Sequence, residues 1–196
     1  MLREDGFVFD DGTISRLGRT HYLVTTTTAN SEAVWRWMNR LLQLEWSTLD
    51  VQITRVTDKY ASLAIAGPNA RSLLAKIAPG FDCEKDNFPF ASVREVRLGQ
   101  KIACRVYSVS YSGEQSFEIN VPARNAPWLY KKVIDEGVDY GLTPYGLETL
   151  DVLRIEKGHL SVGAEIDGRT IPYDLGLGRM VSKRKNFIGR ELLQRP

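Results

Sequence analysis

Two carboxylates, Asp11 and Glu118, stand where an acidic side chain could do chemistry. Asp11 lies in the sequence Asp-Asp-Gly between two strand-like runs. A carboxylate held at the end of a strand could accept a proton or stabilise a positive charge on a bound reactant. The Asp-Gly pair is also favoured in tight hairpin turns, so a purely conformational role for Asp11 stays open.

Glu118 lies within the run 115–121, in which apolar and polar residues alternate. The alternation predicts a strand with Phe117, Ile119 and Val121 on one face and Glu118 on the other. A carboxylate fixed on a strand can accept two parallel hydrogen bonds from a planar N–H/NH₂ edge, such as a guanidine or a pterin presents. The alternative is a strand whose polar face is simply solvated.

Other catalytic patterns are missing from the sequence. It lacks the glycine-rich dinucleotide and phosphate-binding loops and the HExxH, GxSxG and CxxC motifs. Its two histidines, His21 and His159, are interpreted as structural, and we predict no metal site. Cys83 and Cys104 lie in apolar surroundings and are predicted to be buried, reduced thiols.

The composition is that of a globular chain with a core of its own. The protein has 196 residues, of which 43% are hydrophobic and 26% charged. Its net charge of +2 favours no nucleic-acid partner, and the basic run 182–185 carries no interleaved aromatics, which is typical of a solvated face. No apolar run approaches the roughly 20 residues of a membrane span, and we expect a cytoplasmic protein without a membrane partner.

The elements that must position Asp11 lie in the first quarter of the chain. Asp10 to Gly12 would turn a hairpin between the first two strands, and Asn30 or Ser31 would cap the helix that follows. The predicted strands are 6–9, 13–17 and 21–25, and the predicted helix is 31–44.

The elements around Glu118 alternate between strand groups and helices without a regular βαβ repeat. This order predicts an α+β fold with antiparallel sheets flanked by helices. The predicted strands are 51–58, 60–67, 93–98, 101–110 and 115–121, and the predicted helices begin near Pro68 or span 125–136, 145–157 and 186–194.

Five segments, taken in order, resemble the folate-binding module of the glycine-cleavage aminomethyltransferase (T-protein) family. They are EDGFVFDDGTISRL (4–17), GPNA (67–70), YSGEQSFEINVP (111–122), LRIEKGHLSVGAEIDGRTIP (153–172) and FIGRE (187–191). Within that family, the DDG sequence, the threonine run 25–28 and the segment 171–191 are most similar to the C-terminal part of the alpha subunit of heterotetrameric sarcosine oxidases. They are less similar to dimethylglycine dehydrogenases.

The resemblance implies a site for tetrahydrofolate. It assigns Asp11 as the catalytic carboxylate beside the folate N10 and the one-carbon unit. It assigns Glu118 to the edge of the pterin ring, and it implies that Tyr111, Thr26 and Thr27 also bind folate. One departure is Leu150, where the aminomethyltransferases have an arginine four residues before Arg154. This departure weighs against a glycine-cleavage enzyme and fits an oxidase subunit, and Arg154 is interpreted as a brace of the fold.

The resemblance also implies an organisation in subdomains. Residues 1–50 would be the remainder of the first folate-binding subdomain and 51–140 a second α+β subdomain. Residues 141–196 would form a helix and an irregular segment that returns to the first subdomain. The small barrel of the family is absent, so we expect a fragment that is inactive in isolation.

The function implied is that of an oxidoreductase module. It would accept the one-carbon unit released when sarcosine is demethylated oxidatively to glycine, with formation of 5,10-methylenetetrahydrofolate. FAD, FMN and NAD are expected elsewhere in the parent complex, and the beta, gamma and delta subunits are the expected partners. The alternatives are a non-catalytic scaffold for subunit docking, or a fragment of a glycine-cleavage aminomethyltransferase or a dimethylglycine dehydrogenase.

Overall fold

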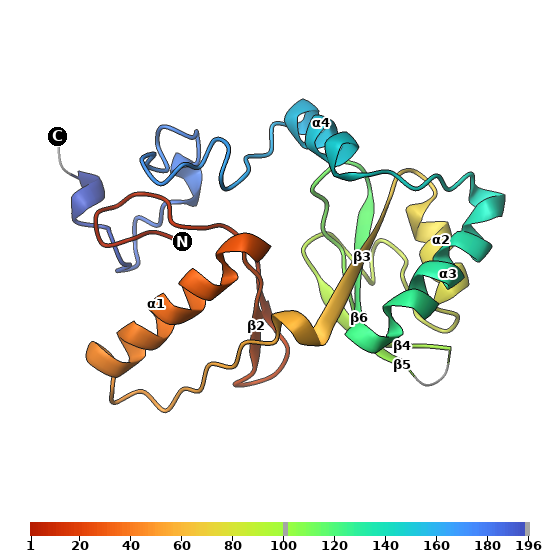
Figure 1. The fold of residues 1–196 in the computed structure, drawn as a ribbon, viewed down its shortest axis with the longest axis horizontal. Helices are drawn as coiled ribbons and strands as arrows, with labels where there is room; N and C mark the ends of the chain where they lie inside the picture. Colours follow the sequence, from red (N-terminus) through yellow and green to blue (C-terminus); the bar gives the residue numbers. More distant parts are fainter. Residues whose placement is uncertain (100–101, 195–196) are drawn as a thin grey trace. The chain divides into compact units, whose positions relative to one another are not determined.

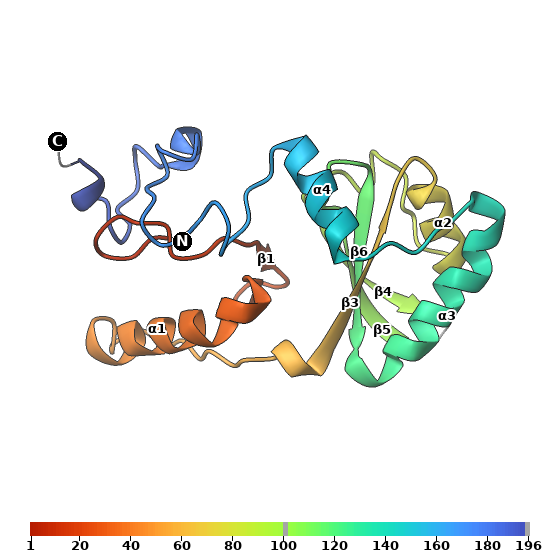
Figure 2. The ribbon, with the colours of Figure 1, turned by 45° about the horizontal axis from the view of Figure 1, so that its top comes forward.

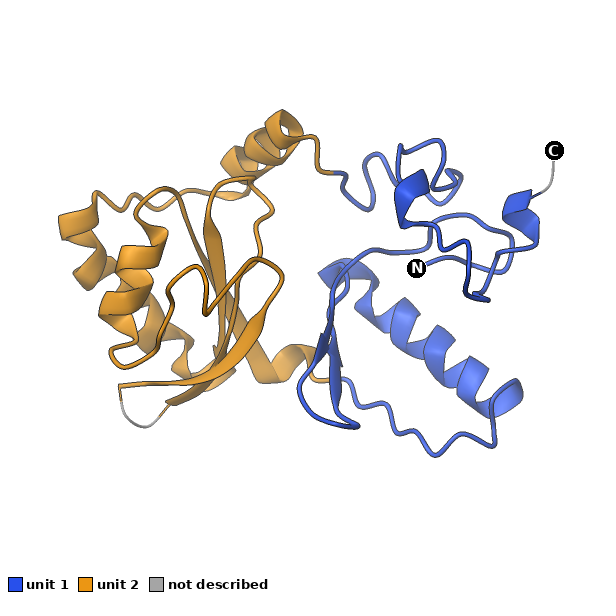
Figure 3. Ribbon diagram, turned by 180° about the vertical axis from the view of Figure 1, so that it is seen from behind, with its two compact units in different colours: residues 1–55, 160–196 blue, residues 56–159 orange. Residues whose placement is uncertain are grey.

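The chain forms two compact units, shown in blue and orange in Figure 3. The computed structural model describes residues 1–99 and 102–194. Unit 1 comprises Met1–Arg55 and Leu160–Pro196, and unit 2 comprises Val56–His159. The chain therefore begins in unit 1, builds the whole of unit 2, and returns to unit 1. Gln100 and Lys101, which belong to the predicted connection and strand after 93–98, and Arg195 of the basic C-terminal segment lie outside the described residues.

Unit 2 is a four-stranded antiparallel sheet with two helices on one face (Figures 1 and 2). The strand order is β3-β6-β5-β4, so β6 is a central strand. The strands are β3 (Tyr60–Ala66), β4 (Val93–Leu98), β5 (Ile102–Tyr107) and β6 (Ser116–Pro122). The helices on the sheet are α2 (Ala70–Ile77) and α3 (Ala126–Gly137), and α4 (Leu147–Lys157) follows them in the chain. The predicted α+β class is confirmed, and so are these strands and helices.

The core of unit 2 lies between the sheet and helices α2 and α3. The apolar side chains of β6 point into it as the alternation predicts, and Phe117, Ile119 and Val121 are fully buried. Cys83 and Cys104 lie in the same core as free thiols, which confirms the prediction for both. Burial raises the pKa of the Cys104 thiol to about 11, so this thiol stays protonated at neutral pH.

The helices α4 and α3 end in different ways. Helix α4 ends at Gly158, whose φ of +82° is the left-handed conformation that glycine adopts without strain. Helix α3 does not end in a left-handed residue at Gly137. A 3₁₀ turn, Val138–Tyr140, continues it, and the chain reverses at Gly141 with φ +69°. Gly137 is needed instead for space, because a Cβ there would lie 2.7 Å from the Cβ of Leu142.

Unit 1 contains a two-stranded sheet, one long helix and irregular chain from both ends. The elements are β1 (Ile14–Arg16), β2 (Tyr22–Val24) and α1 (Ser31–Leu44). The predicted hairpin between 6–9 and 13–17 is wrong, because β1 pairs with β2, with Ile14 opposite Val24. Residues 6–9 contribute only an isolated bridge between Leu2 and Val8. The Val8 N–H instead donates to the Thr170 carbonyl at 2.9 Å, so the returning segment takes the place of the expected strand partner.

The returning segment is packed closely on the N-terminal loop. A Cβ at Gly189 would overlap the Arg3 carbonyl oxygen and lie 3.0 Å from the Gly6 Cα. Leu193 is buried beside Gly6. The predicted helix 186–194 is wrong, since only a 3₁₀ turn, Leu192–Gln194, forms. The glycine at position 189 has φ +84° and interrupts any helix there.

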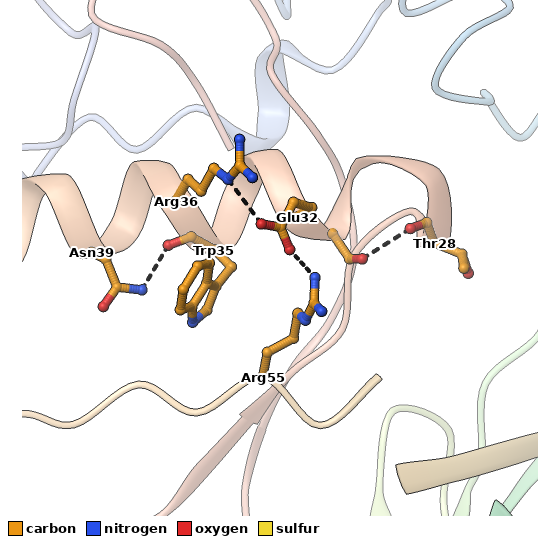
Figure 4. A network of polar contacts seen from close by, with 7 residues as sticks. Thr28, Glu32, Trp35, Arg36, Asn39 and Arg55 are labelled. Atoms are coloured by element: carbon orange, nitrogen blue, oxygen red, sulfur yellow. Dashed lines mark hydrogen bonds and ion pairs between the residues drawn. The ribbon is translucent and has the colours of Figure 1, made fainter. Parts of the chain in front are cut away.

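The predicted strand 51–58 is also wrong. Residues 51–56 run as irregular chain into a 3₁₀ turn, Thr57–Lys59, and pair with no strand among the described residues. Figure 4 shows what holds this segment on its polar side: the Arg55 guanidinium pairs with Glu32 of α1. Arg36 Nε donates to the other oxygen of the same carboxylate at 2.8 Å. Exposed pairs of this kind contribute about 0–1 kcal/mol, so they position the segment without dominating stability.

No helix in the described parts of the chain is long and apolar enough to cross a membrane.

Candidate functional site

A fully buried carboxylate, Asp10, organises the candidate site residues of unit 1. Its Oδ1 accepts hydrogen bonds from the backbone N–H of Asp11 at 2.7 Å and of Thr27 at 3.1 Å. Its Oδ2 accepts from Asn30 Nδ2 at 2.7 Å. The predicted capping role of Asn30 is therefore wrong, because the amide binds Asp10 and the Phe9 carbonyl and leaves the start of α1 without a side-chain cap. Asp10 thus ties the Asp-Asp-Gly segment to the threonine run.

Asp11 is held beside this buried charge while its own side chain reaches solvent. Partial burial, followed by the negative charge of Asp10, raises the pKa of the Asp11 carboxyl above its ordinary value. Thr27 Oγ1 makes a long contact of 3.5 Å to Asp11 Oδ1. A carboxyl with a raised pKa is a better proton acceptor than an ordinary aspartate.

The neighbouring residues fix the backbone on both sides of Asp11. Gly12 has φ +143°, and a Cβ there would overlap the Thr25 carbonyl oxygen, so glycine is required at this position. Thr26 Oγ1 donates to the Thr27 carbonyl at 3.2 Å. The structure therefore brings Asp11 and Thr27 together, whereas the Thr26 hydroxyl is bonded to the backbone of Thr27.

Glu118 occupies the middle of β6, the central strand of unit 2 next to β3 and β5. Its partners across the sheet are Ala64 on β3 and Tyr107 on β5. The carboxylate is half-buried, and within residues 1–99 and 102–194 it makes no hydrogen bond or ion pair. Burial alone raises the pKa of the Glu118 carboxyl. Beside it, Ser62 and Ala64 of β3 are small and exposed, so this face of the sheet is open next to the carboxylate.

Arg105 lies on the same face of the sheet as Glu118, but its guanidinium contacts other residues. Arg105 lies opposite Asn120, one pair along from Glu118 on the same face. Its guanidinium stacks over the Tyr60 ring at 5.2 Å, and its Nε donates to Glu95 at 3.2 Å. The charge of Glu118 is therefore not compensated by this arginine, which is the arrangement expected of a carboxylate that meets a ligand.

Tyr111 is fixed by a histidine. The two rings of Tyr111 and His159 stack with centroids 5.8 Å apart, and His159 Nδ1 donates to the Tyr111 carbonyl oxygen at 2.8 Å. These contacts give His159 the structural role that the sequence suggested. The pairing could not be predicted, because the two residues are far apart in the sequence and are joined only by the fold.

Arg154 braces the end of α4. Its side chain is buried, its Nε donates to Asp151 at 2.6 Å, and its guanidinium reaches the His159 carbonyl at 3.1 Å. Because these bonds hold the chain between the end of α4 and His159, the last residue of unit 2, Arg154 positions His159 and, through it, Tyr111.

Comparison with known proteins identifies the family. The GCVT N-terminal domain family matches residues 1–185. The chain is 45% identical over 197 residues to sarcosine oxidase subunit alpha of Rhizobium meliloti (strain 1021), covering 100% of this chain and 20% of that protein. It is 34% identical over 194 residues to the aminomethyltransferase of Caldanaerobacter subterraneus subsp. tengcongensis, covering 98% of this chain and 50% of that protein.

A solved structure shares the fold. The crystal structure of glycine cleavage system aminomethyltransferase T from Bartonella henselae matches with a TM-score of 0.82 at 24% identity, over 98% of this chain and 50% of that one. The chain belongs to the GCVT N-terminal domain family. It spans between about one fifth and about one half of the length of the relatives named here.

The two neighbouring aspartates should respond differently to substitution. Asp10→Asn keeps the size of the side chain but replaces one acceptor oxygen by an amide NH₂ donor that faces another donor, which should lower the free energy of unfolding by about 1.5–3 kcal/mol. Asp11→Asn is the matched control and should change it by less than about 1 kcal/mol, because the Asp11 carboxylate is exposed. Urea denaturation measures both. Equal effects of the two substitutions would show that Asp10 is not the organising residue.

Proposed function

We propose that this member of the GCVT N-terminal domain family is the tetrahydrofolate-binding, one-carbon-accepting module of a sarcosine oxidase alpha subunit. The observation that carries the proposal is the Glu118 carboxylate, which is half-buried on a central strand and has no partner among the described residues. The identity of 45% to a sarcosine oxidase alpha subunit over the full chain supports the assignment of the parent enzyme.

In this proposal Glu118 binds the edge of the pterin ring. The ring presents an N–H and an NH₂ group side by side, and an ionised carboxylate can accept from both. In the free protein the Glu118 carboxylate has already lost part of its hydration, and these two bonds would offset that cost. Its pKa, which burial raises, would fall when they form. Tyr111, held by His159, and the threonines Thr26 and Thr27 are the further residues proposed to bind folate.

Asp11 is proposed to act at the one-carbon unit. Tetrahydrofolate supplies the chemistry through two nucleophilic nitrogens, N5 and N10, which capture the carbon. Asp11 would move protons between these nitrogens and the amine that leaves, and its raised pKa suits that task. The hydrogen bonds to Asp10 keep the backbone of Asp11 fixed during the reaction, so the protein contributes orientation as well as a base.

The transfer step balances without a net proton. Oxidation of sarcosine, which we place at a flavin elsewhere in the complex, would pass a hydride from the methyl group of the neutral amine to that flavin and give the N-methylene iminium of glycine. Transfer of the methylene carbon to N5 and N10 breaks its bond to the glycine nitrogen. The two N–H protons of the folate end on that nitrogen, and the products are 5,10-methylenetetrahydrofolate and glycine. The other oxidase subunits, beta, gamma and delta, are the proposed partners.

Glu118→Gln tests the binding role. The amide replaces one acceptor oxygen by a donor that faces another donor, so the affinity for tetrahydrofolate should fall by about 1–3 kcal/mol. Because the ionised form binds, the wild-type affinity should also fall as the pH is lowered through the raised pKa, above the ordinary glutamate range. Titration calorimetry across pH measures both effects.

The free protein provides the control, since its stability should show the opposite sign. A carboxyl whose pKa is raised on folding favours the folded state when protonated, so its contribution is present at low pH and is lost as the pH rises through the raised pKa. Glu118→Gln should remove this dependence. If the variant binds tetrahydrofolate with the wild-type dissociation constant, Glu118 is a solvated strand residue and the proposed function loses its main support.

Asp11→Asn tests the catalytic role in the assembled oxidase. Reduction of the flavin by sarcosine should be nearly unchanged, because oxidation precedes the step that Asp11 serves. Formation of 5,10-methylenetetrahydrofolate should slow by about 10²–10⁴-fold, and free formaldehyde from hydrolysed iminium should rise. Rapid-mixing spectroscopy and a formaldehyde assay separate the two steps. If the variant forms 5,10-methylenetetrahydrofolate and free formaldehyde in the wild-type proportions, the non-catalytic scaffold is favoured.

A further inference from the structure

Four cations gather on one exposed stretch of unit 1, residues 179–185, which we call the basic loop. Within residues 1–99 and 102–194 none of the four forms an ion pair. The only carboxylate in the sequence 171–190 belongs to Asp174, and its Oδ2 accepts a hydrogen bond from the Ile171 N–H at 3.0 Å. The positive charge of the loop is therefore not compensated locally. The four cations are Arg179, Lys183, Arg184 and Lys185.

Hydrogen bonds fix the backbone that carries these cations. The Arg190 guanidinium donates to the Lys185 carbonyl at 3.1 Å and to the Lys183 carbonyl at 3.4 Å. Ser182 Oγ accepts from the backbone N–H of Lys185 at 3.0 Å and of Arg184 at 3.3 Å. A loop that is ordered before it meets a partner loses less conformational entropy on binding.

Apolar side chains lie among the cations, and together they line a shallow hollow. Tyr173 and Val181 belong to its wall. The Tyr173 ring is 53% exposed and packs on Gly178, where a Cβ would lie 3.1 Å from the ring Cδ1. Met180, next to Arg179 in the chain, is 79% exposed. Tyrosine, methionine and arginine are the residue types enriched at protein–protein interfaces, so this composition favours a protein partner.

The same geometry disfavours a phosphate ligand. Phosphate sites commonly use successive backbone N–H groups, but the N–H groups of Arg184 and Lys185 are both directed at Ser182. The basic loop itself contains no aromatic residue on which nucleic-acid bases could stack. What the loop offers is separate side-chain charges beside apolar surface, which is complementary to carboxylates interspersed with apolar side chains.

We propose that the basic loop, with Tyr173, docks an acidic and partly apolar segment of another oxidase subunit. This inference rests on the proposed function, in which the beta, gamma and delta subunits are the partners. The cations attract the acidic segment and raise the rate of association. Met180 enters an apolar site on the partner and slows dissociation.

Association kinetics of the complete alpha subunit with the other subunits separate the two contributions. The combined substitution Lys183→Gln, Arg184→Gln and Lys185→Gln keeps the carbonyl groups that bind Arg190 but removes three charges. It should lower the association rate constant about tenfold at low salt and flatten its dependence on salt, with little change in the dissociation rate constant. Met180→Gln should instead raise the dissociation rate constant about fivefold.

A matched control removes the same charge from unit 2. The substitutions Lys59→Gln, Lys85→Gln and Arg97→Gln lie at exposed positions and should leave both rate constants unchanged. The urea midpoint should be the wild-type value in every variant, because each altered side chain is exposed. The affinity for tetrahydrofolate should also be unchanged in every variant.

The outcomes distinguish this inference from the proposed function. If the basic-loop variant and Met180→Gln associate with the wild-type rate constants, the inference is overturned and the proposed function stands. If the basic-loop variant loses affinity for tetrahydrofolate or for a single-stranded RNA oligonucleotide but not for the subunits, the loop binds that ligand and the inference is likewise wrong. A wild-type alpha subunit that does not associate with the other subunits would contradict the proposed function itself.

Discussion

A carboxylate without a protein partner, placed on a central strand of a sheet, is the constraint on which this account of the molecule depends. Removing charge from water costs free energy unless hydrogen bonds or an opposite charge replace the lost hydration. Glu118 is partly desolvated and receives neither from the described residues, while Arg105 on the same face is held by Tyr60 and Glu95. The apolar side of β6 supplies the stability that makes such a cost tolerable. Unit 2 therefore combines a well-packed core with an unsatisfied polar face.

In unit 1, by contrast, the buried carboxylate is satisfied by hydrogen bonds. Asp10 is fully buried and accepts hydrogen bonds from the backbone of Asp11, the backbone of Thr27 and the amide of Asn30. These hydrogen bonds give Asp10 a structural role. They also hold the adjacent Asp11 in place with its carboxylate exposed. Two neighbouring residues of the same type thus have different roles, which their environments assign.

The sequence predicted those parts of the fold that local patterns determine. The alternation around Glu118 gave the strand and its two faces correctly, and the predicted helix 145–157 ends where α4 ends. The hairpin at Asp10 to Gly12 failed because Val8 bonds to Thr170, from a segment that returns late in the chain. The contact between Tyr111 and His159 depends on residues far apart in the sequence, which no local pattern reveals. Asp11 and Glu118 were predicted as site residues from the family resemblance, and their folate roles stay predictions.

The most direct test of the central claim is a titration of the Glu118 carboxyl followed by NMR, with and without tetrahydrofolate. In the free protein the pKa should lie above the ordinary glutamate range because of burial. At saturating tetrahydrofolate it should fall, because two N–H donors then stabilise the ionised form. A pKa that is the same in both titrations, while folate binding is verified independently, would contradict the claim that Glu118 binds the ligand.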